Sequence, residues 1–256
     1  MTNAEALDGS VEAAQSSGKI VLSFTTANAN DVIVVSSDCT GTTAIGISSI
    51  TDNLSTHLTY ARRKNASVKI GAAFHAIDYW TAVWTGSGAI TITVTLTGTP
   101  TSGVGYAFGV SGANTSTPFD PNSSLPASGT SATGAATVTI STSLAYDFLI
   151  AFIDGSMGHD SGFTVPQSSA LSAIEYEVVS SQQSNLVLNP SSHYSAYVLI
   201  ADAIQALSQP SAPSYIPSSM GDGLSWVSQI LKRRFPLPKI KDLNKIMQKT
   251  LLRPPT

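Results

Sequence analysis

The sequence predicts an all-β protein, a two-sheet β-sandwich of jelly-roll type followed by a short α-helical C-terminal tail. The first observation is the segment Ala89 to Thr97, where apolar residues alternate with threonines without a break. This is the period of a strand with one buried and one exposed face. The second is that about a dozen strand-like segments, separated by turn residues, follow one another between residues 19 and 207. The third is the change beyond Ser208 to prolines and then to apolar residues at helical spacing.

The N-terminal half is expected to hold a flexible arm and then eight strands. Residues 1–18 are small and polar; residues 4–15 could form a weak helix or a flexible arm, and we expect this segment to need a partner for order. The apolar run 32–35 predicts a strand that is buried on both faces or lies at the centre of its sheet. Gly103, Gly105 and Gly109 predict a strand that another backbone approaches closely. The expected strands are 19–25, 31–36, 43–50, 56–62, 68–77, 79–84, 89–97 and 104–110.

The C-terminal half of the sandwich begins with a long polar loop, residues 111–135, whose length is typical of functional or mobile loops. Further strands are expected at 138–143, 146–151, 171–179, 185–188 and 194–206. The order of strand, polar turn, aspartate and apolar strand at 20–35 returns at 138–151. Two interpretations fit this echo, an internal duplication and the ordinary pattern of β-hairpins.

The C-terminal region has the strongest functional signal. Residues 208–221 form a linker rich in proline and serine, which stays extended. Residues 222–256 predict two basic amphipathic helices, 222–234 and 239–252, joined by a hinge at Phe235-Pro-Leu-Pro238. We expect their apolar stripes to bind a partner; the alternative is a tail that folds back on its own domain. The expected partner-binding residues are Trp226, Ile230, Leu231, Lys232, Arg233, Arg234, Ile240, Leu243, Ile246 and Met247.

The composition points away from a cytosolic enzyme. Charged residues make up 11% of the chain, against roughly 25% in an average protein, and Ser and Thr supply the polarity instead. No apolar run reaches the roughly 18 residues of a membrane-spanning helix, so we expect no integral membrane protein. The N-terminus has neither the basic nor the apolar region of a secretory signal. Two explanations fit a surface of exported type without an export signal: a virus particle that is released by lysis, and a chain from which the signal has been removed.

Charge is divided unevenly along the chain. Residues 1–210 contain 5 Lys and Arg against 14 Asp and Glu, whereas residues 211–256 contain 8 against 2. The nominal charges, −9 and +6, sum to the −3 of the whole chain. We therefore expect the tail to meet a different partner from the body.

No catalytic or metal-binding motif is present, and we expect no cofactor. The single cysteine, Cys39, excludes a disulfide framework and is expected to be buried and inert. The four histidines lack metal-ligand spacing, and His75 is expected to be a satisfied, half-buried residue. No G-x-S-x-G motif occurs.

Two weaker site candidates each have a structural alternative that we favour. The loop Asp154 to Asp160, with Asp120, offers oxygen ligands for Ca²⁺, but its spacing lacks the D-x-D-x-D-G pattern, which favours a polar turn. Tyr79, Trp80 and Trp84 could stack on a sugar, but aromatic residues on a strand are more often core.

Several segments resemble a loose family of Ser/Thr-rich β-sandwich modules of phage structural proteins and bacterial surface proteins. They are Thr25 to Val35, Ile47-Ser-Ser-Ile-Thr-Asp52, Ile90 to Leu96, Gly109-Val-Ser-Gly with Ser116-Thr-Pro-Phe-Asp120, and Tyr194-Ser-Ala-Tyr-Val-Leu. The resemblance covers residues 19–207 and implies a jelly-roll-like sandwich with a structural or adhesive role. It supplies no catalytic residues.

These observations favour a non-enzymatic virion structural protein, a sandwich (19–207) displayed on the virion surface and anchored by its tail. Its expected partners are other virion or surface-assembly subunits, including copies of itself. A nucleic-acid partner is not expected, because Lys232-Arg-Arg234 lacks interleaved aromatics. The alternative is a cell-surface adhesin or carbohydrate-binding module with a glycan ligand, and a β-sandwich hydrolase ranks last.

Overall fold

Antiparallel β-strands arranged in four sheets make up most of the described part of the chain. The computed structural model describes residues 5–155, 159–170, 172–190 and 195–207, which belong to one compact unit, Met1–Gln209. The strands are numbered β1 to β15 in chain order, and the all-β sandwich prediction is confirmed. Among these residues there is no helix with the length and hydropathy that crossing a membrane requires.

The first half of the chain forms a sandwich of two sheets. The first inner sheet has the order β1-β8-β3-β6-β5, and the first outer sheet has the order β2-β7-β4. This is the strand order of a jelly roll, in which strands 1, 8, 3 and 6 form one sheet and strands 2, 7, 4 and 5 form the other. Here β5 differs, because it pairs with β6 in the inner sheet and not with β4 in the outer sheet. The strands are β1 (Ala6–Ala14), β2 (Lys19–Thr26), β3 (Asp31–Gly41), β4 (Ile47–Asp52), β5 (Ala61–Ile70), β6 (Ala73–Trp84), β7 (Gly88–Leu96) and β8 (Ser102–Ser111).

The second half repeats this arrangement. The second inner sheet, read from its other edge, has the order β9-β15-β11-β13-β12, and the second outer sheet is the pair β10-β14. Each strand of the first inner sheet thus has a counterpart in the same place, while β4 has none. The strands are β9 (Ala127–Thr130), β10 (Val138–Ile140), β11 (Asp147–Gly155), β12 (Thr164–Ser168), β13 (Ser172–Val179), β14 (Leu186–Leu188) and β15 (Ala196–Gln205).

The repeat extends to single residues. Asp31 begins β3 and Asp147 begins β11, and the following residues, Val32 and Phe148, face Val110 and Ile204 in the adjoining strands. In the first half, Leu7 of β1 pairs with Val110; at the corresponding place in the second half, Phe119 forms an isolated bridge with Ile204. The echo in the sequence therefore corresponds to a repeated fold. In the sequence alone, residues 20–25 align with residues 138–143. The structure shifts this alignment by two residues, so that Thr26 corresponds to Thr142.

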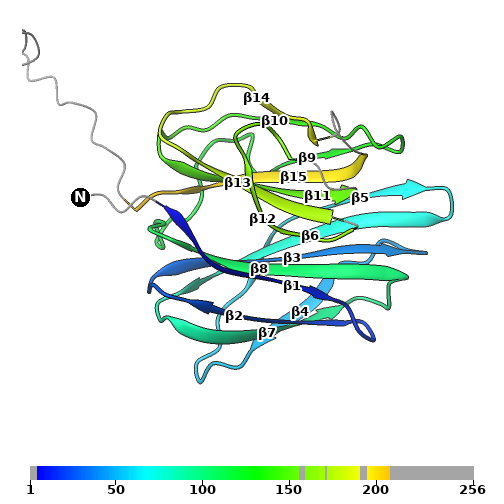
Figure 1. Ribbon diagram of the computed structural model, residues 1–256, viewed down its shortest axis with the longest axis horizontal. Helices are drawn as coiled ribbons and strands as arrows, with labels where there is room; N and C mark the ends of the chain where they lie inside the picture. The colour runs from blue at the N-terminus through cyan, green and yellow to red at the C-terminus, as the bar shows by residue number, and fades with distance from the viewer. Residues whose placement is uncertain (1–4, 156–158, 171, 191–194, 208–256) are drawn as a thin grey trace, which may run out of the picture. The chain divides into compact units, whose positions relative to one another are not determined.

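The four sheets lie in layers, with the two inner sheets against each other (Figure 1). We call the apolar layer between the inner sheets the seam; Val34, Phe108, Phe148 and Ile200 are among its buried residues. Two further cores separate each inner sheet from its outer sheet, one around Ile92 and one around Leu149. Both inner sheets are consequently covered on both faces.

The position of β3 explains its uninterrupted apolar run. Val32 and Val34 point into the seam, whereas Ile33 and Val35 point toward the first outer sheet. A strand between two apolar layers needs apolar residues at every position. By contrast β7, whose outer face meets solvent, buries Ile90, Ile92 and Val94 and alternates them with threonines.

The structure corrects several sequence predictions. Residues 1–18 are not simply a flexible arm, because Ala6–Ala14 form β1 and pair with β8. Residues 56–60 belong to a loop that ends where β5 begins, and the loop 111–135 contains β9. Strand β12 was not expected. The linker 208–221 and the tail 222–256 lie outside the described residues.

Candidate functional site

The structure describes the predicted Ca²⁺ loop in part, but not the predicted partner-binding residues. The ten partner-binding residues, Trp226 to Met247, lie outside the described part of the chain. Asp120 lies near Asp147 at the start of β11, while Asp154 lies seven residues further on, roughly 23 Å away along the strand. The structure therefore does not bring Asp120 and Asp154 together.

The two carboxylates of the Asp154–Asp160 loop already have protein partners. His75 Nδ1 lies 3.0 Å from Asp154 Oδ2, and Asp160 accepts the N–H of Asn189 at 2.9 Å. Among the described residues, no group of three or more His, Cys, Asp and Glu is arranged to hold a metal ion. The prediction of a half-buried, satisfied His75 is confirmed, since its side chain is 19% exposed.

The aromatic residues at 79–84 belong to the fold, as the favoured interpretation predicts. Tyr79 and Trp84 are buried. Trp80 is half-buried, donates its Nε1–H to Asp78 and lies under the Arg62 guanidinium, which is 5.0 Å from the ring centroid. Cys39 is also buried, and burial, followed by the charge of Asp38, raises the pKa of its thiol to about 12.

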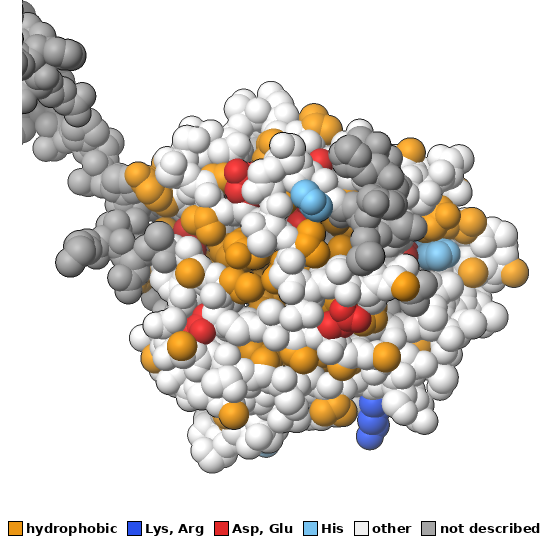
Figure 2. Space-filling model, in the orientation of Figure 1, with side chains coloured by type: hydrophobic (Ala, Val, Ile, Leu, Met, Phe, Trp, Pro, Cys, Tyr) orange, Lys and Arg blue, Asp and Glu red, His pale blue; other side chains and the backbone are white. Residues whose placement is uncertain are grey.

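The acidic residues of the body are inside it. Of the 14 Asp and Glu in residues 1–210, all of which the structure describes, 11 are buried and the other three, Glu12, Asp160 and Glu177, are half-buried. On the face drawn in Figure 2, uncharged polar side chains and backbone predominate, Asp and Glu atoms show only in small separate places, and Lys and Arg show near one edge. The nominal charge of −9 is therefore not a surface charge.

Asp8 and Asp31 form a buried pair of carboxyl groups in the first half. Asp8 accepts the N–H groups of Ala27 and Asn28, at 2.8 and 2.7 Å, and so ties β1 to the turn between β2 and β3. Asp31, at the end of that turn, is fully buried beside Asp8, and neither of its carboxyl oxygens has a hydrogen-bond partner. Gly109 on β8 leaves the space, because a Cβ there would lie 2.9 Å from Asp31 Oδ2.

Asp120 and Asp147 repeat this pair in the second half. Asp120 accepts the N–H groups of Ser143 and Leu144, at 2.9 and 2.8 Å, in the turn between β10 and β11. Asp147 is fully buried beside it, and neither of its carboxyl oxygens accepts a hydrogen bond of normal geometry, although the neighbouring Thr142 hydroxyl opposes the rise of its pKa. The threonine before each turn also repeats its role: Thr26 donates to the carbonyl of Asn28, and Thr142 to that of Leu144.

The inner member of each pair has a raised pKa, and in the first pair the outer member has a lowered one. Burial, and then the charge of Asp8, raises the pKa of Asp31 to about 7. Burial, and then the charge of Asp120, raises the pKa of Asp147 to about 7 as well. Burial alone would also raise the pKa of Asp8, but the N–H groups of Ala27 and Asn28 hold it below its usual value. The inner carboxyl group of each pair thus favours the protonated form.

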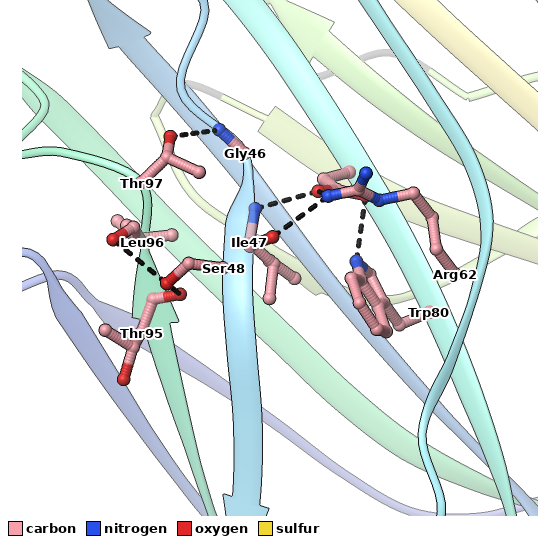
Figure 3. A network of polar contacts seen from close by, with 9 residues as sticks. Gly46, Ile47, Ser48, Arg62, Trp80, Thr95, Leu96 and Thr97 are labelled. Atoms are coloured by element: carbon pink, nitrogen blue, oxygen red, sulfur yellow. Dashed lines mark hydrogen bonds and ion pairs between the residues drawn. The ribbon is translucent and has the colours of Figure 1, made fainter.

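A third network connects the first outer sheet with the first inner sheet (Figure 3). The buried Asp78 carboxylate accepts the N–H of Ile47 at 2.8 Å, Trp80 Nε1 at 2.9 Å and Arg62 Nη2 at 2.8 Å. Arg62 also donates to the carbonyl of Ile47 at 2.9 Å. Burial raises the pKa of Asp78 and these donors oppose the rise. The network holds the start of β4 against β5 and β6, where β5 has left the outer sheet.

A groove of about 580 Å³ opens at one end of the first sandwich, between residues 54–59 and 83–86. Its loop is organised by Asp52, which accepts the N–H of Leu54 at 3.0 Å, the N–H of Leu58 at 2.9 Å and faces His57 Nδ1 at 3.1 Å. Burial tends to raise the pKa of Asp52, but the N–H of Leu58 and the His57 ring outweigh it, so the pKa is lowered. The groove is lined by hydroxyl groups, two leucines and an exposed histidine.

We expect Asp52→Ala to open this groove. The substitution leaves the N–H groups of Leu54 and Leu58 without their acceptor, which costs about 1–3 kcal/mol. Limited digestion with chymotrypsin should then cleave at Leu54, Leu58 or Tyr60 much faster than in the parent protein. His57→Ala removes one exposed contact of Asp52 but leaves the N–H groups of Leu54 and Leu58 on its carboxylate, so it should change the rate much less. Equal cleavage of parent and Asp52→Ala would contradict the role given to Asp52.

Sequence reasoning missed the carboxyl pairs, although one signal was present. Asp31 and Asp147 are part of the echo between the two halves, and each precedes an apolar strand. Their partners could not be found in this way, because Asp8 was placed in an arm and Asp120 in a loop. Only the pairing of β1 with β8 and the bridge at Phe119 bring them to the turns.

Comparisons of the chain with family models, with curated proteins and with solved structures give no match in any of the three. The functional argument therefore depends on the geometry of the molecule.

Proposed function

We propose that this protein is a non-enzymatic structural subunit of a virion, with the stacked sandwich displayed on the particle surface and the C-terminal residues as its attachment. The observation that supports this most is where the charge lies. The body keeps its carboxyl groups inside and presents an exterior with few charges, whereas 8 of the 13 Lys and Arg are in residues 211–256. Contacts through the body would then depend little on salt, and contacts through the tail strongly.

The rigid frame also fits a structural part better than a catalytic one. The titratable side chains that sequence reasoning considered for chemistry, such as His75 and Asp154, are paired with each other between strands. Arg63 and Asp202 connect the two inner sheets in the same way. Both ion pairs therefore hold the two inner sheets together.

Deleting residues 211–256 tests the proposal. The truncated protein should keep the melting temperature of the sandwich but fail to incorporate into particles, which gradient sedimentation of particles with bound protein would measure. Two full-length variants separate the contributions: alanine at Lys232, Arg233 and Arg234 tests charge, and alanine at Ile240, Leu243 and Ile246 tests the apolar stripe. Normal incorporation of the truncated protein would rule out tail attachment.

A second candidate, a cell-surface adhesin or glycan-binding module, is favoured by the groove at residues 54–59 and 83–86, because hydroxyl groups beside an apolar floor can recognise a neutral sugar. The Trp84 indole is buried, and Gly86 lies against its Nε1, so it offers little face for stacking. A glycan array with the parent protein and with a Thr56→Ala, Thr85→Ala variant would test this. Binding that the variant loses would favour the adhesin.

A further inference from the structure

The repeated carboxyl pairs have a feature that a structural hydrogen bond alone does not explain. In each pair the outer member, Asp8 or Asp120, uses its oxygens to accept backbone N–H groups. The inner member, Asp31 or Asp147, is 0% exposed, and neither of its oxygens accepts a hydrogen bond of normal geometry from a described group. The polar side chain beside Asp31 is Asp8, and Asp147 has Asp120 and Thr142 nearby. An ionised carboxylate without a partner is very costly to bury, so the inner group needs another way to be satisfied.

The surroundings supply no counter-charge for the inner groups. In β6 and β13 the residues paired with Asp31 and Asp147 are Trp84 and Val179, and in β15 the residue paired with Asp147 is Gln205. Gly109 of β8 lies beside Asp31. The titratable groups that face them are acidic: Asp8 faces Asp31, and Asp120 and Glu5 face Asp147. In the described residues, the arginine ion pairs go to Asp78 and Asp202 instead.

We propose that Asp8–Asp31 and Asp120–Asp147 are two corresponding proton-binding sites, each of which holds one proton between its carboxyl groups and thereby stabilises the contact between the outer aspartate and the neighbouring turn. The proton resides on the inner group, whose O–H faces the outer carboxylate, while the outer carboxylate keeps its backbone N–H donors. Release of the proton to solvent leaves two negative charges side by side in a buried place. The turns at residues 27–30 and 143–146 then loosen.

The same arrangement of an outer aspartate, a turn and a buried inner aspartate occurs in both halves of the chain. Two halves that share few residues at equivalent positions retain Thr26 and Thr142, Asp31 and Asp147, and the contacts of Asp8 and Asp120 with two N–H groups. The second site has an extra acidic neighbour. Burial, and then the charge of Asp147, raises the pKa of Glu5 to about 8.

The direction of the pH dependence follows from the raised pKa values of the inner groups. A carboxyl group with a pKa of about 7 in the folded protein and about 4 in the unfolded chain is protonated in the folded state over that whole interval. The folded state thus binds more protons, so stability is highest below about pH 4 for these groups and is lost as the pH rises through about 7. Asp8 and Asp52, whose pKa values are lowered, contribute in the opposite direction and only in stronger acid.

Calorimetry of the full chain between about pH 5 and about pH 8.5 tests the proposal. We expect the melting temperature to fall by at least about 5 °C across this interval. Other carboxyl groups also have raised pKa values, namely Glu5, Glu12, Asp38, Asp78, Asp154, Glu175 and Asp202. The decisive comparison is therefore with Asp31→Asn, Asp147→Asn, which mimics the protonated form. This variant should lose at least half of the fall. Asp52→Asn is the matched control and should leave the fall unchanged.

Two further measurements keep the proposal open to refutation if the double variant folds poorly. Carbon NMR of the carboxyl groups in the parent protein should give titration midpoints near 7 for Asp31 and Asp147; midpoints below about 5 would overturn it. A rise in melting temperature with millimolar Ca²⁺ in mild alkali, absent from the double variant, would also overturn it, since the sites would then bind a cation. So would pH profiles of parent and double variant that superpose.

Discussion

Replacing Arg63 with alanine should lower the melting temperature by about 10 °C near neutral pH. Arg63 on β5 donates from Nε and Nη2 to Asp202 on β15, at 3.1 and 2.9 Å, so the ion pair joins the two halves across the seam. Asp202 is 0% exposed. Removing one partner of a buried pair leaves an uncompensated charge, which costs about 3–5 kcal/mol, and each kcal/mol corresponds to about 2–4 °C in a domain of this size. The stacking of the guanidinium on Phe119, at 3.5 Å from the ring centroid, is lost as well.

Arg62→Ala is the matched control, because it removes the same side chain one residue earlier. Arg62 is 43% exposed, and its partner Asp78 keeps the N–H donors of Ile47 and Trp80. We expect a clearly smaller loss than for Arg63→Ala, because Asp78 keeps two donors and Arg62 is partly solvated. The deficit of Arg63→Ala should also shrink in mild acid, where burial already raises the pKa of Asp202 to about 6 despite Arg63. Equal losses in the two variants, or a loss independent of pH, would contradict the role of the seam pair.

Phe148→Ala should destabilise the whole stack by about 3–5 kcal/mol, because it leaves a cavity in the seam. The Phe148 ring is fully buried, lies 4.7 Å from the Tyr176 ring at an interplanar angle of 5°, and faces Phe108 of the first half at 6.4 Å. Since residues of both inner sheets line this cavity, we expect one calorimetric transition that moves down as a whole. Phe148→Leu should cost less, and Val21→Ala, at a position 53% exposed, almost nothing.

Two separate transitions, of which only one moves in Phe148→Ala, would show that the halves melt independently. The seam would then be a docking contact between two units. A parent protein with a single transition and a variant with none would instead show that the seam is needed for folding.

The strands that the sequence predicted well are those whose environment is simple. In Ile90 to Leu96, apolar residues alternate with threonines because one face of β7 is buried and the other faces solvent. The apolar run at 32–35 is unbroken because β3 lies between two cores. The prediction failed at residues 56–60, where Leu58 and Tyr60 look strand-like but pack in a loop held by Asp52. Strand β12 has mixed burial and a register shift, so it shows no clear period.

The candidate sites depended on contacts that no local pattern contains. Asp8 meets a turn about twenty residues away, and Arg63 meets Asp202 in the other half of the chain. Burial of the carboxyl groups could not be predicted from the composition, because carboxyl groups are rarely buried without partners. Burial of 11 carboxyl groups follows from the doubled core, which has too few basic residues to pair with them.

The order of the strands also has a consequence during synthesis. Every strand of the first two sheets lies between residues 6 and 111, so the N-terminal half can assemble as soon as that segment has left the ribosome. Its face with Val34 and Phe108 then stays open to water until the residues of β11 and β15 follow. A nascent chain in this state presents an apolar sheet that self-associates, and chaperones would recognise it. Slow translation of residues 112–205 would therefore lower the yield of the folded protein.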